Sequence, residues 1–229
     1  DFICIHYTVM QLEFELKYNR GVDKRNVVQD IYDTERFIQS MRIFNTIEPV
    51  GSIFEQQFKT APQISQEKSQ LVRIVCYCLN PNHYHFLLEE IADGGISEFM
   101  KRLGGGYTKY FNEKYSRNGS LFQGRFKSVH VNSNAYLQHL SAYINLNYLV
   151  HRLGRPTSKS DTWQSSWDEY VNTDSIRKKH KSQLCSNEII TGNFKTPADY
   201  ETFAKETVAG IIERRYESEV GDIDKLLLE

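Results

Sequence analysis

Two histidines separated by one tyrosine lie in a strand-like run and could bind a divalent metal ion. His83, Tyr84 and His85 open an apolar stretch, and side chains on a β-strand alternate between its faces, so both imidazoles point the same way. They lie a little under ~7 Å apart along the backbone, and Tyr84 and Phe86 point to the opposite, buried face. Because the His-x-His pattern fits two surface histidines equally well, the metal prediction depends on which other groups converge there.

A phenol and an amide on a later segment could act beside such a metal. Tyr143 and Asn147 are four residues apart in a helical pattern, so they share a helical face. A tyrosine hydroxyl with a pKa of ~10 is a weak nucleophile at neutral pH and needs an activated electrophile. A metal on His83 and His85 could polarise a phosphodiester. Tyr143 could then attack the phosphorus, leaving a phosphotyrosine and a free 3′ hydroxyl, with Asn147 as an oxygen ligand. The alternative for Tyr143 is a core aromatic on an amphipathic helix.

The elements that would position these residues follow from apolar periodicity and turn signals. Strands are predicted at 12–18, 71–79, 83–89 and 121–131, and helices at 33–41, 96–115, 132–145 and 200–216. This order predicts an α+β fold, an antiparallel sheet with helices packed on one face, followed by a C-terminal helical extension. Three glycines at 104–106 interrupt the second helix and predict a kink there or a close approach of backbone to a ligand.

Charge is distributed unevenly along a chain whose net charge is −1. Residues 101–131 carry seven basic side chains against Glu113 alone, whereas residues 199–229 carry nine acids against four bases. A basic segment in a near-neutral chain indicates a local polyanion-binding face, with a solvated helix face as the alternative. Aromatic residues interleave with these cations, a combination suited to unpaired bases and phosphates. The predicted DNA contacts are Lys109, Lys114, Arg117, Arg125 and Lys127, the last two on one exposed strand face.

Length and composition narrow the class of protein. A chain of 229 residues can hold one domain of ~150 residues and an appendage. No apolar run approaches the ~18 residues of a membrane span, and no signal peptide is evident, so no membrane partner is expected. Cys76 and Cys78 are two residues apart, on one face of a predicted strand, and are expected to be buried thiols in a reducing compartment, which predicts a cytoplasmic protein.

Three ordered segments resemble the signatures of the REP-associated tyrosine transposases, which belong to the HUH single-tyrosine nucleases. They are Pro-Asn-His-Tyr-His-Phe-Leu-Leu at 81–88, Leu-Phe-Gln-Gly-Arg-Phe-Lys-Ser at 121–128 and Tyr-Ile-Asn-Leu-Asn at 143–147. Residues 18–24 resemble the opening strand and turn of that family, and residues 163–166 its post-catalytic segment. The predicted organisation is an N-terminal extension at 1–11, a nuclease domain at 12–170 and a helical tail at 171–229.

The resemblance implies a ferredoxin-like domain that cuts and rejoins single-stranded DNA at hairpin-bearing sites through a 5′-phosphotyrosine, using Mg²⁺ or Mn²⁺. It makes His83 and His85 metal ligands and Tyr143 the nucleophile, and Asn147 matches the polar residue four positions later. The family usually has proline after that asparagine, whereas Tyr148 stands here and removes a helix stop. Monomer and homodimer are both compatible with the sequence. The alternatives are a non-catalytic, domesticated nucleic-acid-binding module on the same scaffold and a metal-dependent phosphohydrolase of small molecules.

Overall fold

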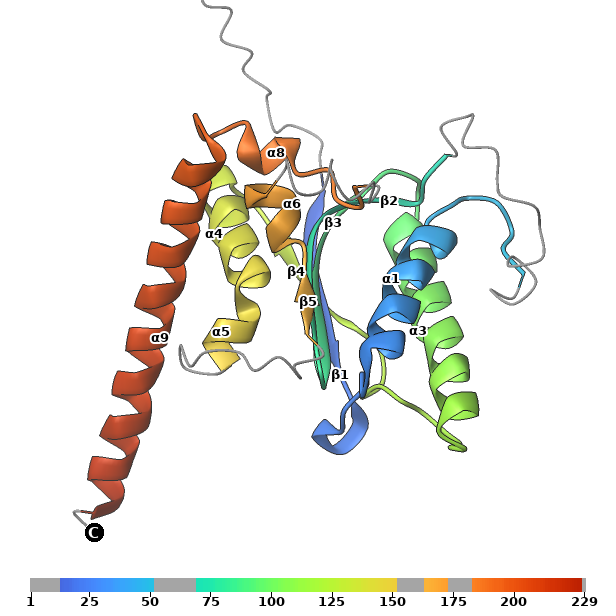
Figure 1. Ribbon diagram of the computed structural model, residues 1–229, viewed down its shortest axis with the longest axis horizontal. Coiled ribbons are helices and arrows are strands. Elements are labelled where there is room, and N and C mark those ends of the chain that lie inside the picture. Colours follow the sequence, from blue (N-terminus) through green and yellow to red (C-terminus); the bar gives the residue numbers. More distant parts are fainter. Residues whose placement is uncertain (1–12, 52–68, 152–162, 173–182, 228–229) are drawn as a thin grey trace, which may run out of the picture.

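The computed structural model describes residues 13–51, 69–151, 163–172 and 183–227, with side chains described as far as residue 216 (Figure 1). The predicted extension at 1–11 lies outside these residues. Within them, one antiparallel sheet has the strand order β4-β1-β3-β2-β5. Its strands are β1 (Phe14–Arg20), β2 (Val72–Asn80), β3 (His83–Glu90), β4 (Lys127–Val131) and β5 (Gln164–Ser165).

The helices cover both faces of the sheet. They are α1 (Ile31–Phe44), α3 (Gly95–Lys114), α4 (Asn134–Asn145), α5 (Asn147–His151), α6 (Trp167–Val171), α8 (Glu188–Thr191) and α9 (Pro197–Leu227), with a short 3-10 helix η1 (Val22–Lys24) after β1. Figure 1 shows α1 and α3 on one side of the sheet and α4, α5 and α9 on the other. The order β1-α1-β2-β3-α3-β4 and the strand arrangement β4-β1-β3-β2 define a ferredoxin-like unit. The predicted α+β class and C-terminal helix are confirmed.

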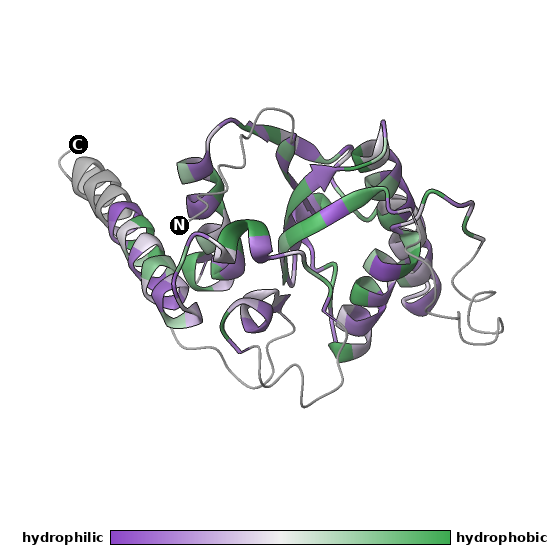
Figure 2. Cartoon of the chain, turned by 90° about the horizontal axis from the view of Figure 1, so that it is seen from above, coloured by the Kyte–Doolittle hydropathy of each residue, from purple (hydrophilic) through white to green (hydrophobic). Residues whose placement is uncertain are grey.

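The prediction that the helices pack on one face of the sheet is only partly correct. The helices α1 and α3 share one face, whereas α4 and α9 cover the other. The reason is that the central strands are apolar on both faces, so each face needs a cover. On β3, Tyr84 and Phe86 enter a core with α1 and α3, whereas Leu87 enters a second core with α4 and α9. Figure 2 shows these apolar strands enclosed between helices whose outer surfaces are more polar.

The long helix α9 is part of the second core over its first half. Tyr200, Ala204 and Val208 recur at intervals of four, which places them on one helical face, and all three are buried with Leu137 and Leu140 of α4. Among the described helices, none combines the length and apolarity that crossing a bilayer requires.

The three glycines do not kink α3, which is continuous from Gly95 to Lys114. Gly106 packs so closely on the Phe44 ring that a Cβ atom there would lie 2.6 Å from it. At Gly104 and Gly105, by contrast, an added Cβ would meet nothing within 4 Å. Both border a cleft of about 590 Å³ between α3 and the start of β4. Close packing of α1 on α3 therefore explains one glycine of the three.

The fourth predicted strand is regular only over its second half. Phe122 makes an isolated bridge with Gly21, and regular pairing with β1 begins at Lys127. Gly124 explains the delay, because its φ of +67° lies in the left-handed region and bends the chain. The first helix also differs in its start, since Asp30 caps α1 by accepting a hydrogen bond from the backbone N–H of Asp33.

Candidate functional site

The two histidines lie at the end of the β2–β3 hairpin, beside the end of β1. Asn80 and His83 pair across the two-residue turn, and His83 also pairs with Arg20. The two imidazole centroids are 5.2 Å apart and both side chains are buried. This confirms the prediction that His83 and His85 share a face.

Hydrogen bonds determine which nitrogen of the His83 ring carries the proton and which can bind a cation. The amide Nδ2 of Asn82 donates to the carbonyl of Lys24 at 3.3 Å, so the Oδ1 of Asn82 is the atom that faces His83. That oxygen lies 2.6 Å from Nδ1 of His83 and can only accept, so Nδ1 carries the proton. The unprotonated Nε2 of His83 faces the interior of the site, where it accepts a hydrogen bond from the Nδ2 of Asn80 at 3.0 Å.

His85 lies between two tyrosine rings. Tyr18 of β1 stacks on it with ring centroids 5.7 Å apart, and Tyr143 of α4 meets it edge-on at the same distance. The Nδ1 of His85 is buried without a hydrogen-bond partner. A buried nitrogen without a partner is costly in a purely structural role, and a metal ion would satisfy it.

The second core determines where Tyr143 lies. Ser133 caps α4, and the buried Leu140 and Ile144 press one face of the helix onto the sheet. Tyr143 lies at the margin of that face, half-buried, with its ring against His85. The structure thus brings the predicted nucleophile together with the histidine pair.

Asn147 follows directly on a short turn at Leu146 and begins α5. It is buried, and its Oδ1 lies 2.9 Å from the Nδ2 of Asn80 and 3.2 Å from the Nε2 of His83. Its own Nδ2 is buried without a partner. The predicted polar residue therefore lies beside His83 despite the absence of proline at position 148.

A third histidine, which the sequence analysis missed, completes the cluster. His151 ends α5, and its ring centroid lies 4.4 Å from that of His83. One ligand nitrogen from each of His83, His85 and His151 lies within 4.8 Å of the other two. Its spacing of four residues after Asn147 and eight after Tyr143 was a helical signal in the sequence.

These donors fit a divalent cation. Burial lowers the pKa of His83 to about 4 and that of His85 to about 3, and the neighbouring histidines add to both effects. Both rings are therefore neutral near pH 7, the state in which imidazole binds metals. The Nε2 of His83 and the Oδ1 of Asn147 are two acceptors 3.2 Å apart, close to the separation of about 3 Å expected for neighbouring ligands of an octahedral ion with bonds of about 2.1 Å.

Positive charge borders the site. The Nζ of Lys127 lies 5.9 Å from the centre of the Tyr18 ring. Arg20 and Arg215 are near enough that their charges contribute to a lower pKa of His151, after its burial. Cations from β4, β1 and α9 thus border the histidine cluster and make its surroundings positive.

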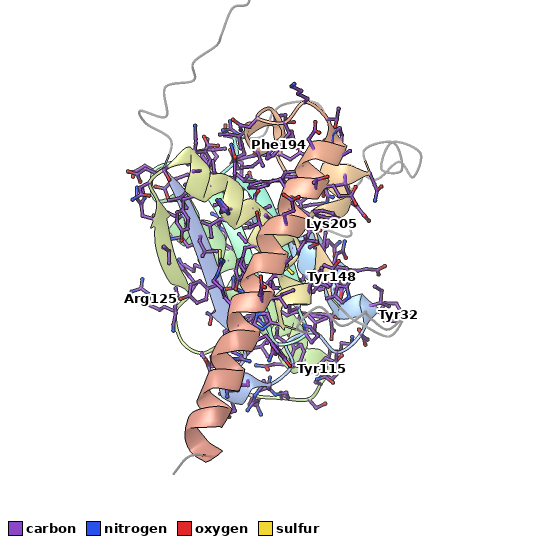
Figure 3. All side chains as sticks on the ribbon, turned by 90° about the vertical axis from the view of Figure 1, so that its left-hand side faces the viewer. Tyr32, Tyr115, Arg125, Tyr148, Phe194 and Lys205 are labelled. Atoms are coloured by element: carbon purple, nitrogen blue, oxygen red, sulfur yellow. The ribbon has the colours of Figure 1, made fainter. Side chains whose placement is uncertain are left out.

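The other predicted DNA contacts lie elsewhere. Lys109, Lys114 and Arg117 belong to α3 or follow it, on the far face of the sheet from the histidines. Lys114 is bound there by Asp30 and Asp33 at 2.7 Å each. Arg125 lines the cleft beside α3 and extends outward in Figure 3. The prediction that Arg125 and Lys127 share a strand face is wrong, because the chain bends at Gly124 and β4 begins only at Lys127.

The predicted burial of the cysteines is confirmed. Cys76 and Cys78 are free, buried thiols facing the second core, and Cys185 is buried in the first. Among the described residues, the histidine cluster consists of His83, His85 and His151 and includes none of these thiols.

Fold and site together define a histidine-pair centre on an antiparallel sheet, faced by a tyrosine from the following helix. Residues 51–147 match the family model described as "Transposase IS200 like". This segment of the chain is similar to the IS200-like transposases, which agrees with the resemblance predicted from the motifs.

Two further comparisons were made. A solved structure described as "Structure of the REP associates tyrosine transposase bound to a REP hairpin" aligns with 71% of this chain and 81% of its own, at a TM-score of 0.40 and 12% identity. No curated protein matches the sequence.

Proposed function

We propose that the protein is a metal-dependent single-stranded DNA endonuclease and strand transferase that acts at hairpin-bearing DNA through a 5′-phosphotyrosine. The observation that carries the proposal is the contact between the Tyr143 ring and His85, beside the unprotonated Nε2 of His83. Nucleophile and cation donors then lie on one surface, as phosphoryl transfer to a phenol requires. The family match over residues 51–147 supports transposase chemistry in general.

In the proposed reaction Tyr143 supplies the attacking oxygen. Its Oη forms a bond to phosphorus, the phenolic proton is released, and the P–O3′ bond breaks to leave a 3′ hydroxyl after proton uptake. The phosphoester bond is exchanged for another of similar energy, so the reverse step can join strands. A divalent ion held by His83, His85 and Asn147, Mg²⁺ or Mn²⁺, would polarise the phosphate and stabilise the charge that builds on it.

Other groups of the chain would orient the DNA. Arg20 and Lys127 border the site and can neutralise the flanking phosphates. Tyr18, which is half-buried and stacks on His85, would stack an unpaired base at the edge of the site. The hairpin itself is proposed from the motif resemblance.

A covalent-adduct assay tests the proposal. Wild-type protein, mixed with Mn²⁺ and a 5′-labelled or 3′-labelled hairpin-tipped oligonucleotide, should form a denaturant-resistant complex carrying only the 3′ part of the cut strand. Tyr143→Phe should abolish that complex and retain binding to the oligonucleotide. Tyr136→Phe is the matched control, because Tyr136 is a more exposed tyrosine on the same helix and away from the histidines.

The outcome separates the alternatives. An adduct that persists in Tyr143→Phe would assign the nucleophile to another residue. Tight binding of hairpin DNA without any cleavage by the wild type would favour the non-catalytic module. Hydrolysis of small phosphodiesters with no affinity for DNA at low salt would favour a phosphohydrolase.

A further inference from the structure

We propose that His151, in place of Asn147, is the third protein ligand of the metal, and that the resulting three-histidine site selects Mn²⁺, Co²⁺ or Zn²⁺ over Mg²⁺. The importance of His151 for catalysis rests on the proposed function, whereas metal binding by the three histidines can be tested without it. The inference starts from the convergence of His83, His85 and His151, whose donor nitrogens all lie within 4.8 Å of one another.

The local sequence accounts for the position of His151. After the turn at Leu146, α5 carries Tyr148 at the position where the resembling family has proline. Residues four apart on a helix lie on one face, so Asn147 and His151 both face His83. The departure from the family motif thus coincides with the segment that brings a third imidazole to the site.

Packing holds α5 in this orientation. Val150 is buried in the second core. Tyr148 stacks on Trp163 with ring centroids 3.7 Å apart and planes 11° from parallel. In Figure 3 Tyr148, which belongs to α5, lies beside α9. With contacts on two sides, α5 has little freedom to turn His151 away from His83.

The hydrogen bonds of Asn147 favour an imidazole as the third ligand. The Oδ1 of Asn147 already accepts a hydrogen bond from the Nδ2 of Asn80, on the neighbouring strand. An amide oxygen shared with a buried N–H is a weaker metal donor than a free imidazole nitrogen. His151 is exposed and no hydrogen bond occupies its ring among the described contacts, so it is free to turn onto a cation.

The donor set determines the metal. Mg²⁺ is a hard ion that prefers oxygen and retains its waters, whereas imidazole suits manganese, cobalt and zinc progressively better along the Irving–Williams series. Metal–nitrogen bonds of about 2.1 Å place neighbouring donors roughly 3 to 3.5 Å apart, so the three rings must close slightly from their present spacing. Three ligands on one side leave open positions for a phosphate oxygen.

Metal titration of the full chain tests the inference without using activity. Calorimetry with MnCl₂, ZnCl₂ and MgCl₂, and the visible absorption of CoCl₂-loaded protein, should show binding of Mn²⁺, Zn²⁺ and Co²⁺ at least tenfold tighter than of Mg²⁺. His151→Ala should weaken Mn²⁺ and Co²⁺ binding by about 10- to 100-fold, the range found when a metal's supporting groups are removed, and should change the cobalt spectrum. His139→Ala is the matched control, an exposed histidine of α4 that packs on Phe203 instead.

Further variants keep the test decisive. His151→Asn replaces the imidazole by an amide oxygen donor and should therefore narrow the preference for Mn²⁺ over Mg²⁺. Circular dichroism and a metal-free melting curve establish that each variant is folded. Unchanged Mn²⁺ affinity and an unchanged cobalt spectrum in a folded His151→Ala protein would overturn the inference, as would equal affinities of the wild type for Mg²⁺ and Mn²⁺. Intact three-histidine binding without any Tyr143 adduct would overturn the proposed function alone.

Discussion

At the scale of single residues, Asn82 controls the chemistry of His83 without being a candidate ligand itself. Its Oδ1 holds the proton on Nδ1, which leaves Nε2 unprotonated and able to accept from the Nδ2 of Asn80 at 3.0 Å. We expect Asn82→Ala to lower Mn²⁺ affinity by about tenfold, because groups that orient a ligand are typically worth 10- to 100-fold in affinity. Calorimetry measures the affinity, and the ¹⁵N shifts of the histidine rings report the tautomer. A protein that keeps both the affinity and the tautomer would show that Asn82 has no such role.

The two sides of the sheet should contribute differently to DNA affinity. Lys127 borders the site, whereas Lys109 lies on the far face, exposed, with Glu113 3.9 Å away. Lys127→Ala should weaken binding of a single-stranded oligonucleotide and reduce the slope of log affinity against log salt by about 0.7, the value for one phosphate contact with a single strand. Lys109→Ala is the comparison, with a change near zero. Fluorescence anisotropy at several salt concentrations measures both, and a larger effect of Lys109 would move the DNA path to α3.

The residue scale also shows how far the sequence alone could lead. The shared face of His83 and His85 was predictable because strand alternation is local, and the facing of Tyr143 followed from the motif resemblance. His151 was missed because it lies beyond the matching motif, which ends at Asn147, and its helical spacing from Tyr143 and Asn147 was not followed further along the chain. The ion pairs of Lys114 with Asp30 and Asp33 depend on two helices far apart in sequence, which composition cannot reveal.

At the scale of elements, α3 shows that neighbouring identical residues can have opposite constraints. Gly104→Ala adds a Cβ that meets nothing within 4 Å, so it should raise the free energy of unfolding by up to about 1 kcal/mol through helix propensity. Gly106→Ala should lower it by about 1–3 kcal/mol, because its Cβ would lie 2.6 Å from the buried Phe44 ring. Urea denaturation of the two variants gives the comparison directly. Equal effects would mean that α1 can move aside freely.

The same element marks the limit of prediction from pattern. Three glycines within a helix predicted a kink, yet α3 is continuous, because its burial against the sheet and α1 outweighs a propensity cost of about 1 kcal/mol for each glycine. Four strand positions were predictable to within a few residues, apart from the start of β4, where a single left-handed glycine delays the pairing, and the two-residue β5 was not predicted. The helices at 132–145 and 200–216 were predicted, but their packing on the second face was not, because it depends on tertiary contacts between distant segments.

At the scale of the whole molecule, a buried hydrogen-bond network joins α9 to the site helix. The Tyr200 hydroxyl accepts from the Nδ2 of Asn145 at 2.8 Å and lies 3.2 Å from the Oγ of Ser141. Ser166 donates to the Oδ1 of Asn145 at 2.5 Å and accepts from the backbone N–H of Tyr77 on β2. Asn145 is thereby held by both α9 and the sheet.

This network fixes the rotation of α4 about its axis. Ser141 and Asn145 lie two residues either side of Tyr143, on the buried face of the helix, so any turn of α4 that breaks their hydrogen bonds also moves the phenol away from His85. The helix α9 is therefore a support of the candidate site as well as a cover for the second core.

Tyr200→Phe tests that link, because it removes one hydroxyl and leaves the packing of the ring. We expect a loss of about 1–3 kcal/mol in the free energy of unfolding, the cost of leaving a buried partner unsatisfied. Adduct formation with saturating DNA should slow several-fold while DNA affinity stays close to that of the wild type, because Tyr200 touches neither the histidines nor the bordering cations. Tyr216→Phe, at an exposed position of the same helix, should change neither quantity. Equal losses of adduct rate and DNA affinity in Tyr200→Phe would point to general loosening of the fold instead of a displaced nucleophile.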